Sequence, residues 1–201
     1  PTYAVVIGNT ETAKIPGVSA AGAVPEITDF TPAADVELLH YGRCKCIDGV
    51  PVTPTGVPTP GIITMSALQL SPMPTFAVNG GVRVRPHTPF FEVEGEPGED
   101  IRTGKALKDP RRVYENGVLL GREMAKGSEY LVIGESIAGG TTTALAVLKV
   151  VAVVTGHVLG AVASHDRAVH LLPERHHVTG QLSLLAAMVA FTAGGLYLLF
   201  A

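Results

Sequence analysis

The chain has few charged residues and almost no excess of either sign. Its 201 residues include 15 Lys and Arg against 18 Asp and Glu, a formal net charge of −3. So weak a charge gives no overall attraction to nucleic acid or to anionic lipid. Only two local clusters, Arg83/Arg85 and Arg111/Arg112, are suited to contact an anion. We therefore expect no nucleic-acid partner.

Cysteine is nearly absent. Cys44 and Cys46 are the only two, and they are separated by one residue. Two thiols so spaced make no disulfide scaffold and do not match the usual paired zinc knuckle. Two reduced thiols in a cytoplasmic protein are favoured over a metal half-site. The first residues, PTYAVVIGNTETAK, contain no basic stretch followed by a long apolar core, so we expect no secretory signal.

Histidines are scattered through the last quarter of the chain without a metal-binding pattern. They do not form the helical i, i+4 pair with a glutamate base that marks a zinc peptidase. Solvent-facing histidines are the favoured interpretation, and we expect neither a metal ion nor a cofactor. The residues concerned are His157, His165, His170, His176 and His177.

Apolar β-branched runs alternate with glycine turns and helical patterns along the chain. Strands are predicted over residues 3–7, 75–78 and 130–133. Helices are predicted from an N-cap at Thr31 to near Gly42, over residues 62–70, and from Asp109-Pro110 to Gly127. The proline-rich residues 48–60 are predicted to lie on the surface or to line a cleft. Because this alternation continues to residue 154, we predict an α/β fold with a mostly parallel sheet and helices on both faces, a Rossmann-like three-layer architecture.

One glycine-rich stretch, GESIAGGTT at residues 134–142, has almost the spacing of a nucleotide-phosphate loop. It fits G-x-x-x-x-G-K-[ST] except that Gly140 replaces the lysine. A helix that starts there directs backbone N–H groups at an anion, and glycines allow a phosphate to approach closely. The missing lysine and the carboxylate of Glu135 disfavour a polyphosphate, so a monophosphate fits better than ATP. A turn needed only for tight strand-to-helix packing explains the spacing equally well.

The same stretch carries a family resemblance. It is similar to the G-E-x-x-x-G-N-T-T loop of the nicotinate-nucleotide:dimethylbenzimidazole phosphoribosyltransferases, with Gly140 in place of asparagine. Five separated segments of residues 3–148 resemble an uncharacterised prokaryotic branch of that family. These are VIGNTETAKIPGVSAAG, FTPAADVELLHYG, DGVPVTPTGVPTPGIIT, GEPGEDIRTGKA and YLVIGESIAGGTTTALAVL.

The resemblance implies a reaction, substrates and site residues. Such enzymes transfer ribose phosphate from nicotinate mononucleotide to dimethylbenzimidazole, a benzimidazole-type base, in cobalamin lower-ligand synthesis, and relatives suggest a homodimer. By the resemblance, Gly139, Gly140, Thr141 and Thr142 hold the phosphate. Glu135 and Ser136 lie near the ribose and the rest of the substrate, and the turn Asn79-Gly80-Gly81 borders the base pocket.

The resemblance ends near residue 148, and this limits the prediction. The family's general base lies in its C-terminal part, and the acidic residues here after Val150, Asp166 and Glu174, lie in no matching motif. The catalytic base is therefore unassigned, and we expect slow transfer or none. A nucleotide-monophosphate-binding protein without turnover is the alternative. We predict a phosphoribosyltransferase-like α/β domain with a phosphate loop over residues 1–148, completed by a divergent or truncated segment, residues 149–201.

The last 20 residues, 182–201, carry no charge and are long enough to cross a bilayer. The pair Gly194-Gly195 and the lack of a flanking basic cluster favour a buried helix followed by a strand. We expect no membrane partner.

Overall fold

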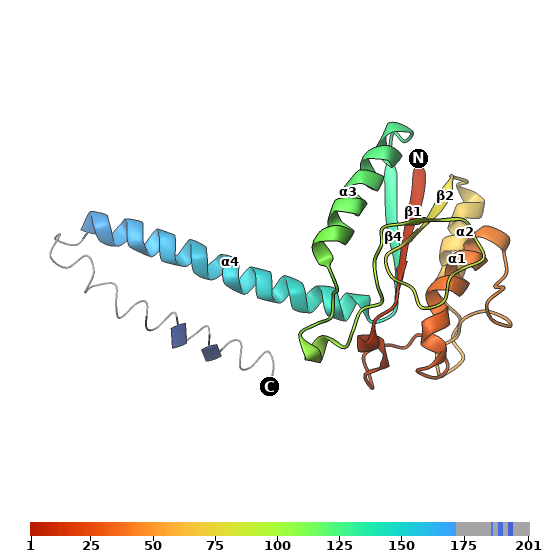
Figure 1. Cartoon of the computed structure of the whole chain (residues 1–201), viewed down its shortest axis with the longest axis horizontal. Helices are drawn as coiled ribbons and strands as arrows, with labels where there is room; N and C mark the ends of the chain where they lie inside the picture. Colours follow the sequence, from red (N-terminus) through yellow and green to blue (C-terminus); the bar gives the residue numbers. More distant parts are fainter. Residues whose placement is uncertain (172–185, 187–188, 191–192, 195–201) are drawn as a thin grey trace. The chain divides into compact units, whose positions relative to one another are not determined.

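A computed structural model of the chain describes residues 1–171, 186, 189–190 and 193–194 (Figure 1). The chain divides into two compact units, Pro1–Thr143 and Ala144–Ala201. The first unit contains the sheet and all the site residues predicted from the sequence. The helix and strand predicted over residues 182–201 lie for most of their length outside the described residues. That residues 149–201 complete the first domain stays a prediction.

The sheet has four parallel strands in the order β3-β2-β1-β4. Their bounds are Thr2–Gly8 for β1, Thr75–Asn79 for β2, Phe90–Glu92 for β3 and Leu131–Ile137 for β4. The parallel sheet confirms the predicted fold class. β3 was not predicted, because three residues are too few to show a strand pattern. The hydrophobic core lies where β1 and β2 meet the first helix, and contains Val5, Ile7, Val36 and Ala77.

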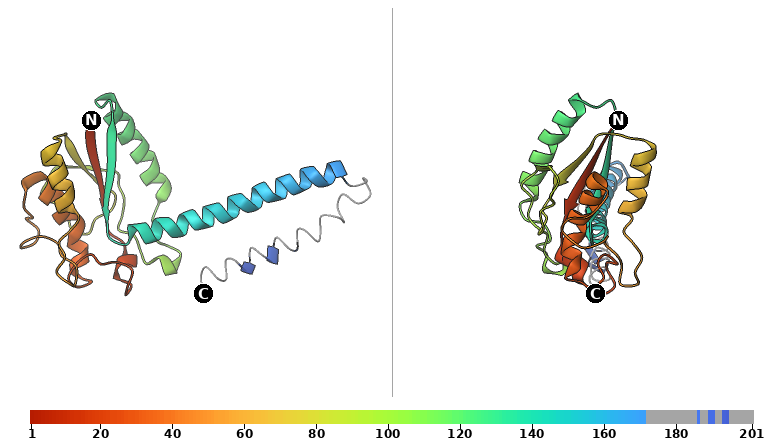
Figure 2. Two further views of the ribbon diagram at one scale, coloured as in Figure 1. Left: turned by 180° about the vertical axis from the view of Figure 1, so that it is seen from behind. Right: turned by 90° about the vertical axis from the view of Figure 1, so that its right-hand side faces the viewer.

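Helices lie on both faces of this sheet. α1 (Thr31–Tyr41) and α2 (Gly61–Leu70) connect β1 to β2, and α3 (Pro110–Lys126) connects β3 to β4. The right-hand view of Figure 2 shows α3 on one side of the sheet and α2 on the other. Three short 3-10 turns, η1 (Glu11–Lys14), η2 (Ile27–Phe30) and η3 (Ile101–Thr103), lie in the connecting loops. This arrangement is Rossmann-like.

The predicted ends of α1 and α3 agree with the structure, with one exception. Gly42 ends α1 with a φ of 68°, a left-handed conformation that glycine adopts without strain, and Gly127 caps α3. Thr31 is the first residue of α1 and is not its N-cap. The reason is that η2 runs directly into α1, so that Phe30 already has helical backbone angles, with φ −87° and ψ −20°.

β4 is longer than predicted, and the glycine loop is shorter. β4 pairs with β1 from Leu131 to Ile137, because β1 offers backbone partners as far as Gly8. Only Ala138 and Gly139 therefore separate β4 from the next helix, α4 (Gly140–Leu171). The strand expected before residue 154 does not form, because residues 141–154 contain no glycine or proline and continue α4. Within the described residues one helical segment, Gly140–Ala163, is long and apolar enough to cross a membrane, judged by length and composition only.

Candidate functional site

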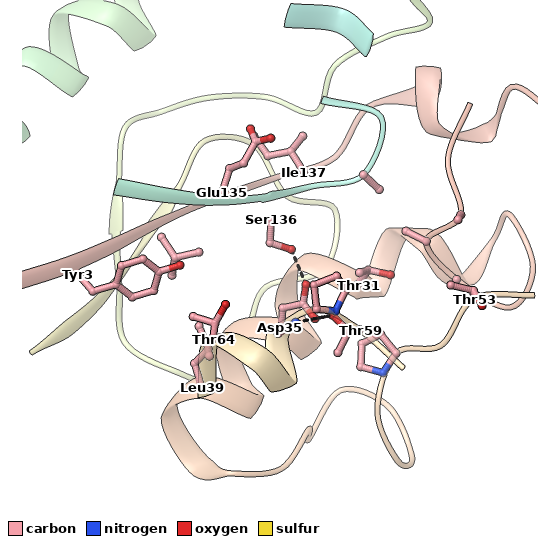
Figure 3. A pocket seen from close by; sticks show the side chains of 18 residues that line it. Tyr3, Thr31, Asp35, Leu39, Thr53, Thr59, Thr64, Glu135, Ser136 and Ile137 are labelled. Carbon is pink, nitrogen blue, oxygen red and sulfur yellow. Dashed lines mark hydrogen bonds between the residues drawn. The ribbon is translucent and has the colours of Figure 1, made fainter. Parts of the chain in front are cut away.

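A cavity of about 390 Å³ opens beside the point where the strand order reverses (Figure 3). The chain leaves β1 towards β2 on one side and returns to β4 on the other, and such a switch point is where open parallel sheets bind ligands. β1 and β4 form one wall of the cavity, and α1, the start of α2, the proline-rich loop and residues 20–22 between η1 and η2 form the rest. The loop contributes Pro51, Thr53, Thr59 and Pro60, in agreement with the prediction that it lies on the surface or lines a cleft.

Asp35 is the carboxylate at the centre of the polar side of this cavity. One turn into α1, it accepts a hydrogen bond from Ser136 Oγ at 2.7 Å on Oδ2 and one from Thr59 Oγ1 at 2.8 Å on Oδ1 (Figure 3). Burial raises the pKa of the Asp35 carboxyl above its usual range, against the opposing effect of these two hydrogen bonds. A half-buried carboxylate with oriented partners in a cavity is a candidate for binding or proton transfer.

The neighbours of Asp35 fix the direction of its hydrogen bonds. Thr59 Oγ1 accepts from the Gly61 N–H at 3.1 Å, so its own proton is available for Asp35. A Cβ on Gly61 would lie 3.3 Å from Asp35 Oδ1, a tight contact that a larger residue would relieve only by a small shift of the Asp35 side chain. Burial raises the pKa of the Tyr3 phenol above its usual value, and the charge of Asp35 raises it further.

Thr31 lies one turn before Asp35 on α1 and also lines the cavity. Its side chain is buried, with 8% of the residue exposed. Among the residues that the structure describes, its Oγ1 has no hydrogen-bond partner. Buried hydroxyl groups are almost always paired in folded proteins, so this hydroxyl at the cavity can pair with a ligand or with a water molecule there.

Glu135 and Ser136 both line the cavity, as the resemblance to the transferases implies for residues near the substrate. They are neighbours on β4, so their side chains point to opposite faces of the sheet. Ser136 points towards α1 and donates to Asp35, whereas the side chain of Glu135 is exposed. Gly134 has a packing role, because a Cβ there would overlap the Tyr3 ring.

The four predicted phosphate-binding residues lie beyond the cavity wall, which ends at Ala138. Gly139 has a φ of +71°, and a Cβ on it would lie 2.8 Å from the Ala13 backbone nitrogen of η1. A Cβ on Gly140 would lie 2.9 Å from Ile137 Cβ. Both glycines are thus required by packing alone. Thr141 and Thr142 are exposed in the first turn of α4, ahead of the first helical bond, which runs from the Thr143 N–H to the Gly139 carbonyl at 3.3 Å.

The turn Asn79-Gly80-Gly81 follows β2 and does not line this cavity. Asn79 uses its side chain within the turn: Oδ1 accepts from the Gly81 N–H at 2.9 Å and the Val82 N–H at 3.0 Å, and Nδ2 donates to Glu92 at 2.9 Å. Gly80 and Gly81 are covered by backbone of residues 95–97. The structure therefore brings Glu135 and Ser136 to the cavity and leaves this turn outside it.

The two thiols lie beside a buried carboxylate, Glu37 of α1. Cys44 and Cys46 are free, and their Sγ atoms donate to carbonyl groups of Ala34 and Phe30. Burial, and after it the charge of Glu37, raise the pKa of Cys44 to about 11 and that of Cys46 to about 12. Thiols held protonated in this way are poor metal ligands. Within the described range, no group of three or more His, Cys, Asp or Glu is placed to hold a metal ion.

The arginines that the sequence marks as anion contacts are each paired with carboxylates. Arg83 bonds to Glu11 and lies 3.5 Å from Asp29, and Lys14 joins the same cluster at 3.1 and 3.0 Å from these acids. The other three of these arginines form the pairs Arg85–Glu92 at 3.2 Å, Arg111–Glu115 at 2.9 Å and Arg112–Glu94 at 2.8 Å. An anion would have to compete with these acids for the arginines.

Sequence reasoning missed Asp35 and Thr31 as site residues. In the sequence they lie four residues apart at the start of a helix. Acidic and hydroxyl side chains are common there, because they cap the helix N-terminus and interact favourably with the helix dipole. The spacing i, i+4 places them on one face of α1, and this was the only available signal. Only the tertiary fold shows that the face lines a cavity.

No model of a known protein family matches the chain. The chain is similar to UPF0284 proteins of archaea. It is 50% identical to that of Sulfurisphaera tokodaii over 147 residues, 48% identical to that of Archaeoglobus fulgidus over 149, and 44% identical to that of Methanothermobacter thermautotrophicus over 149. Each match covers 73% of this chain and 42–44% of the relative, so the chain spans less than half the length of these relatives. Their name states no activity, and the established likeness is to an uncharacterised group of archaeal proteins.

Proposed function

We propose that the chain carries the substrate-binding part of a phosphoribosyltransferase-like protein, which transfers ribose phosphate from nicotinate mononucleotide to a benzimidazole-type base in cobalamin lower-ligand synthesis. The observation that supports it is the cavity at the β1/β4 switch point, whose β4 wall continues through Ala138 and Gly139 into the first turn of α4. A base-sized cavity and a helix N-terminus suited to one phosphate thus lie on one continuous segment.

In this proposal, different parts of the segment bind different parts of the mononucleotide. The N–H groups of the first turn of α4 and the hydroxyl groups of Thr141 and Thr142 bind the 5′-phosphate, and Glu135 lies near the ribose. A nitrogen of the accepting base attacks C1′ as nicotinate leaves. Positioning of the two substrates supplies most of the rate enhancement. We propose a cytoplasmic homodimer that needs no cofactor or metal ion.

A nucleotide-monophosphate-binding protein without turnover is the second candidate. It is favoured by the acidic residues after Val150, Asp166 and Glu174, which lie in no motif that matches the general base of the transferases. In this case the mononucleotide binds as above, but no general base assists transfer to the accepting base.

Both candidates require binding of the mononucleotide. Calorimetric titration of the full chain with nicotinate mononucleotide and with MgATP tests this binding. We expect tighter binding of the mononucleotide, because no lysine neutralises further phosphates. Thr141→Ala should weaken it by about 1.5–3 kcal/mol, the range for a hydrogen bond to a charged group. Because Thr141 is exposed, this variant should fold normally, and Thr103→Ala on η3 is a control away from α4.

Chromatographic detection of released nicotinate, with dimethylbenzimidazole present, separates the two candidates. Transfer supports the enzyme, and mononucleotide binding without transfer supports the second candidate. Equal or tighter binding of MgATP, or mononucleotide binding unchanged in Thr141→Ala, would show that the turn before α4 only packs against η1 and that the proposal is wrong.

A further inference from the structure

We infer that Asp35 and Thr31 select the ligand of the cavity, and that this ligand is a planar, uncharged heteroaromatic compound with a ring N–H. The identification of this ligand with the accepting base rests on the proposed function. The recognition itself rests on the cavity, on two oriented hydrogen bonds and on one unpaired buried hydroxyl.

Asp35 is held as a hydrogen-bond acceptor. Thr59 Oγ1 donates to one of its oxygens at 2.8 Å and Ser136 Oγ to the other at 2.7 Å, and these donors come from the proline-rich loop and from β4. A carboxylate has about four acceptor positions, so each oxygen keeps capacity for another donor. Because the carboxylate lines the cavity, a ligand in that space can supply a further donor.

Thr31 adds a second polar contact from the same face of α1. Its hydroxyl is buried and, among the described residues, unpaired. A hydroxyl both donates and accepts, so it can pair with a heteroatom of a ligand beside Asp35. The cost of leaving it unpaired in the free protein is recovered when the ligand binds.

The remaining wall excludes a charged phosphate and suits an aromatic ring. Tyr3, Val5 and Leu39 give the cavity an apolar side, and its volume of about 390 Å³ is typical of a small-molecule site. The carboxylate of Asp35, which faces the cavity, repels an anion. The phosphate of a mononucleotide therefore lies elsewhere, and the cavity takes the uncharged partner.

The experiment compares 5,6-dimethylbenzimidazole with 1,5,6-trimethylbenzimidazole, in which a methyl group replaces the ring N–H. Both are titrated into the full-length wild type without nucleotide. We expect the compound with the N–H to bind about 10- to 100-fold more tightly, the range for a hydrogen bond to a charged group. In Asp35→Asn this preference should fall at least several-fold, whereas the exposed control Asp48→Asn should keep it.

Thr31→Val separates recognition from a structural role. It removes the unpaired hydroxyl and keeps the shape, so the thermal midpoint of the free protein should stay the same or rise. Binding of 5,6-dimethylbenzimidazole should nevertheless weaken several-fold. A hydroxyl that only supports the fold would give the opposite pair of results.

The inference is overturned if wild type binds neither compound, binds both equally, or keeps its full preference in Asp35→Asn. It is also overturned if Thr31→Val binds as wild type does. Failure of the proposed function gives a different result: nicotinate mononucleotide does not bind in preference to MgATP, while the N–H preference and its dependence on Asp35 persist.

Discussion

Glu37→Gln should destabilise the fold strongly, because Glu37 connects α1 to two loops from a fully buried position, with 0% of the residue exposed. Its Oε2 accepts from the N–H groups of Lys45 at 2.5 Å and Cys46 at 2.8 Å. Its Oε1 accepts from the His87 N–H at 2.9 Å and faces His87 Nδ1 at 2.7 Å. Glutamine keeps one acceptor oxygen, so in either orientation its NH₂ group faces backbone donors.

The magnitude follows from the pKa of Glu37. Burial raises this pKa, but the hydrogen bonds from His87, Lys45 and Cys46 outweigh burial and lower it from 4.5 to about 2. A difference of about 2.5 units corresponds to about 3 kcal/mol of folding free energy at neutral pH. Because the folded pKa is depressed, this contribution is complete above pH 4.5 and is lost as the pH falls towards 2. About 2 kcal/mol should be lost between pH 7 and pH 3.

Urea unfolding of the full chain, followed by circular dichroism at pH 7 and at pH 3, measures both effects. Glu37→Gln should cost about 3 kcal/mol at pH 7, and the gap to wild type should narrow at pH 3. Glu115→Gln removes an exposed partner of Arg111 on α3 and should change stability by less than about 0.5 kcal/mol. A loss below about 1 kcal/mol for Glu37→Gln, or a gap independent of pH, would refute the reasoning.

Three further predictions concern packing and reactivity. Gly139→Ala should lower the free energy of unfolding by about 1–3 kcal/mol, because Gly139 has a φ of +71° and the new Cβ would lie close to the Ala13 backbone. The control in the same denaturation series is Gly127→Ala, since Gly127 has a φ of −101° and a Cβ there would meet nothing within 4 Å. Gly134→Val should lower the thermal midpoint by overlap with Tyr3, and the loss should shrink in a Tyr3→Ala background; equal losses in both backgrounds would contradict this contact. At pH 8, Cys44 and Cys46 should react with iodoacetamide far more slowly in the folded chain than in the urea-unfolded chain, because burial and Glu37 raise their pKa values to about 11 and 12. Mass spectrometry measures the two rates. Equal rates would show that the thiols are not so buried.

The sequence by itself determined the elements that depend on local pattern. A β-branched run specifies β1, Pro32 and Gly42 delimit α1, and Pro110 and Gly127 delimit α3, because these residues restrict the backbone wherever they occur. The strand and helix alternation was enough to predict a parallel sheet with helices on both faces. Local pattern placed Glu135 and Ser136 in a loop after the predicted strand 130–133, and it was the resemblance that put them near the substrate; both line the cavity.

Tertiary structure decided what depends on partners distant in the chain. The extension of β4 through Glu135 and Ser136 depends on hydrogen bonds to β1, more than 120 residues earlier, so the apparent phosphate loop is mostly strand and helix. Asp35 is a site residue only because Thr59 and Ser136 meet it, the latter from 101 positions away. Local sequence restricts φ and ψ at each residue, whereas burial, pKa and cavity shape arise from contacts between segments that the chain brings together only when it folds.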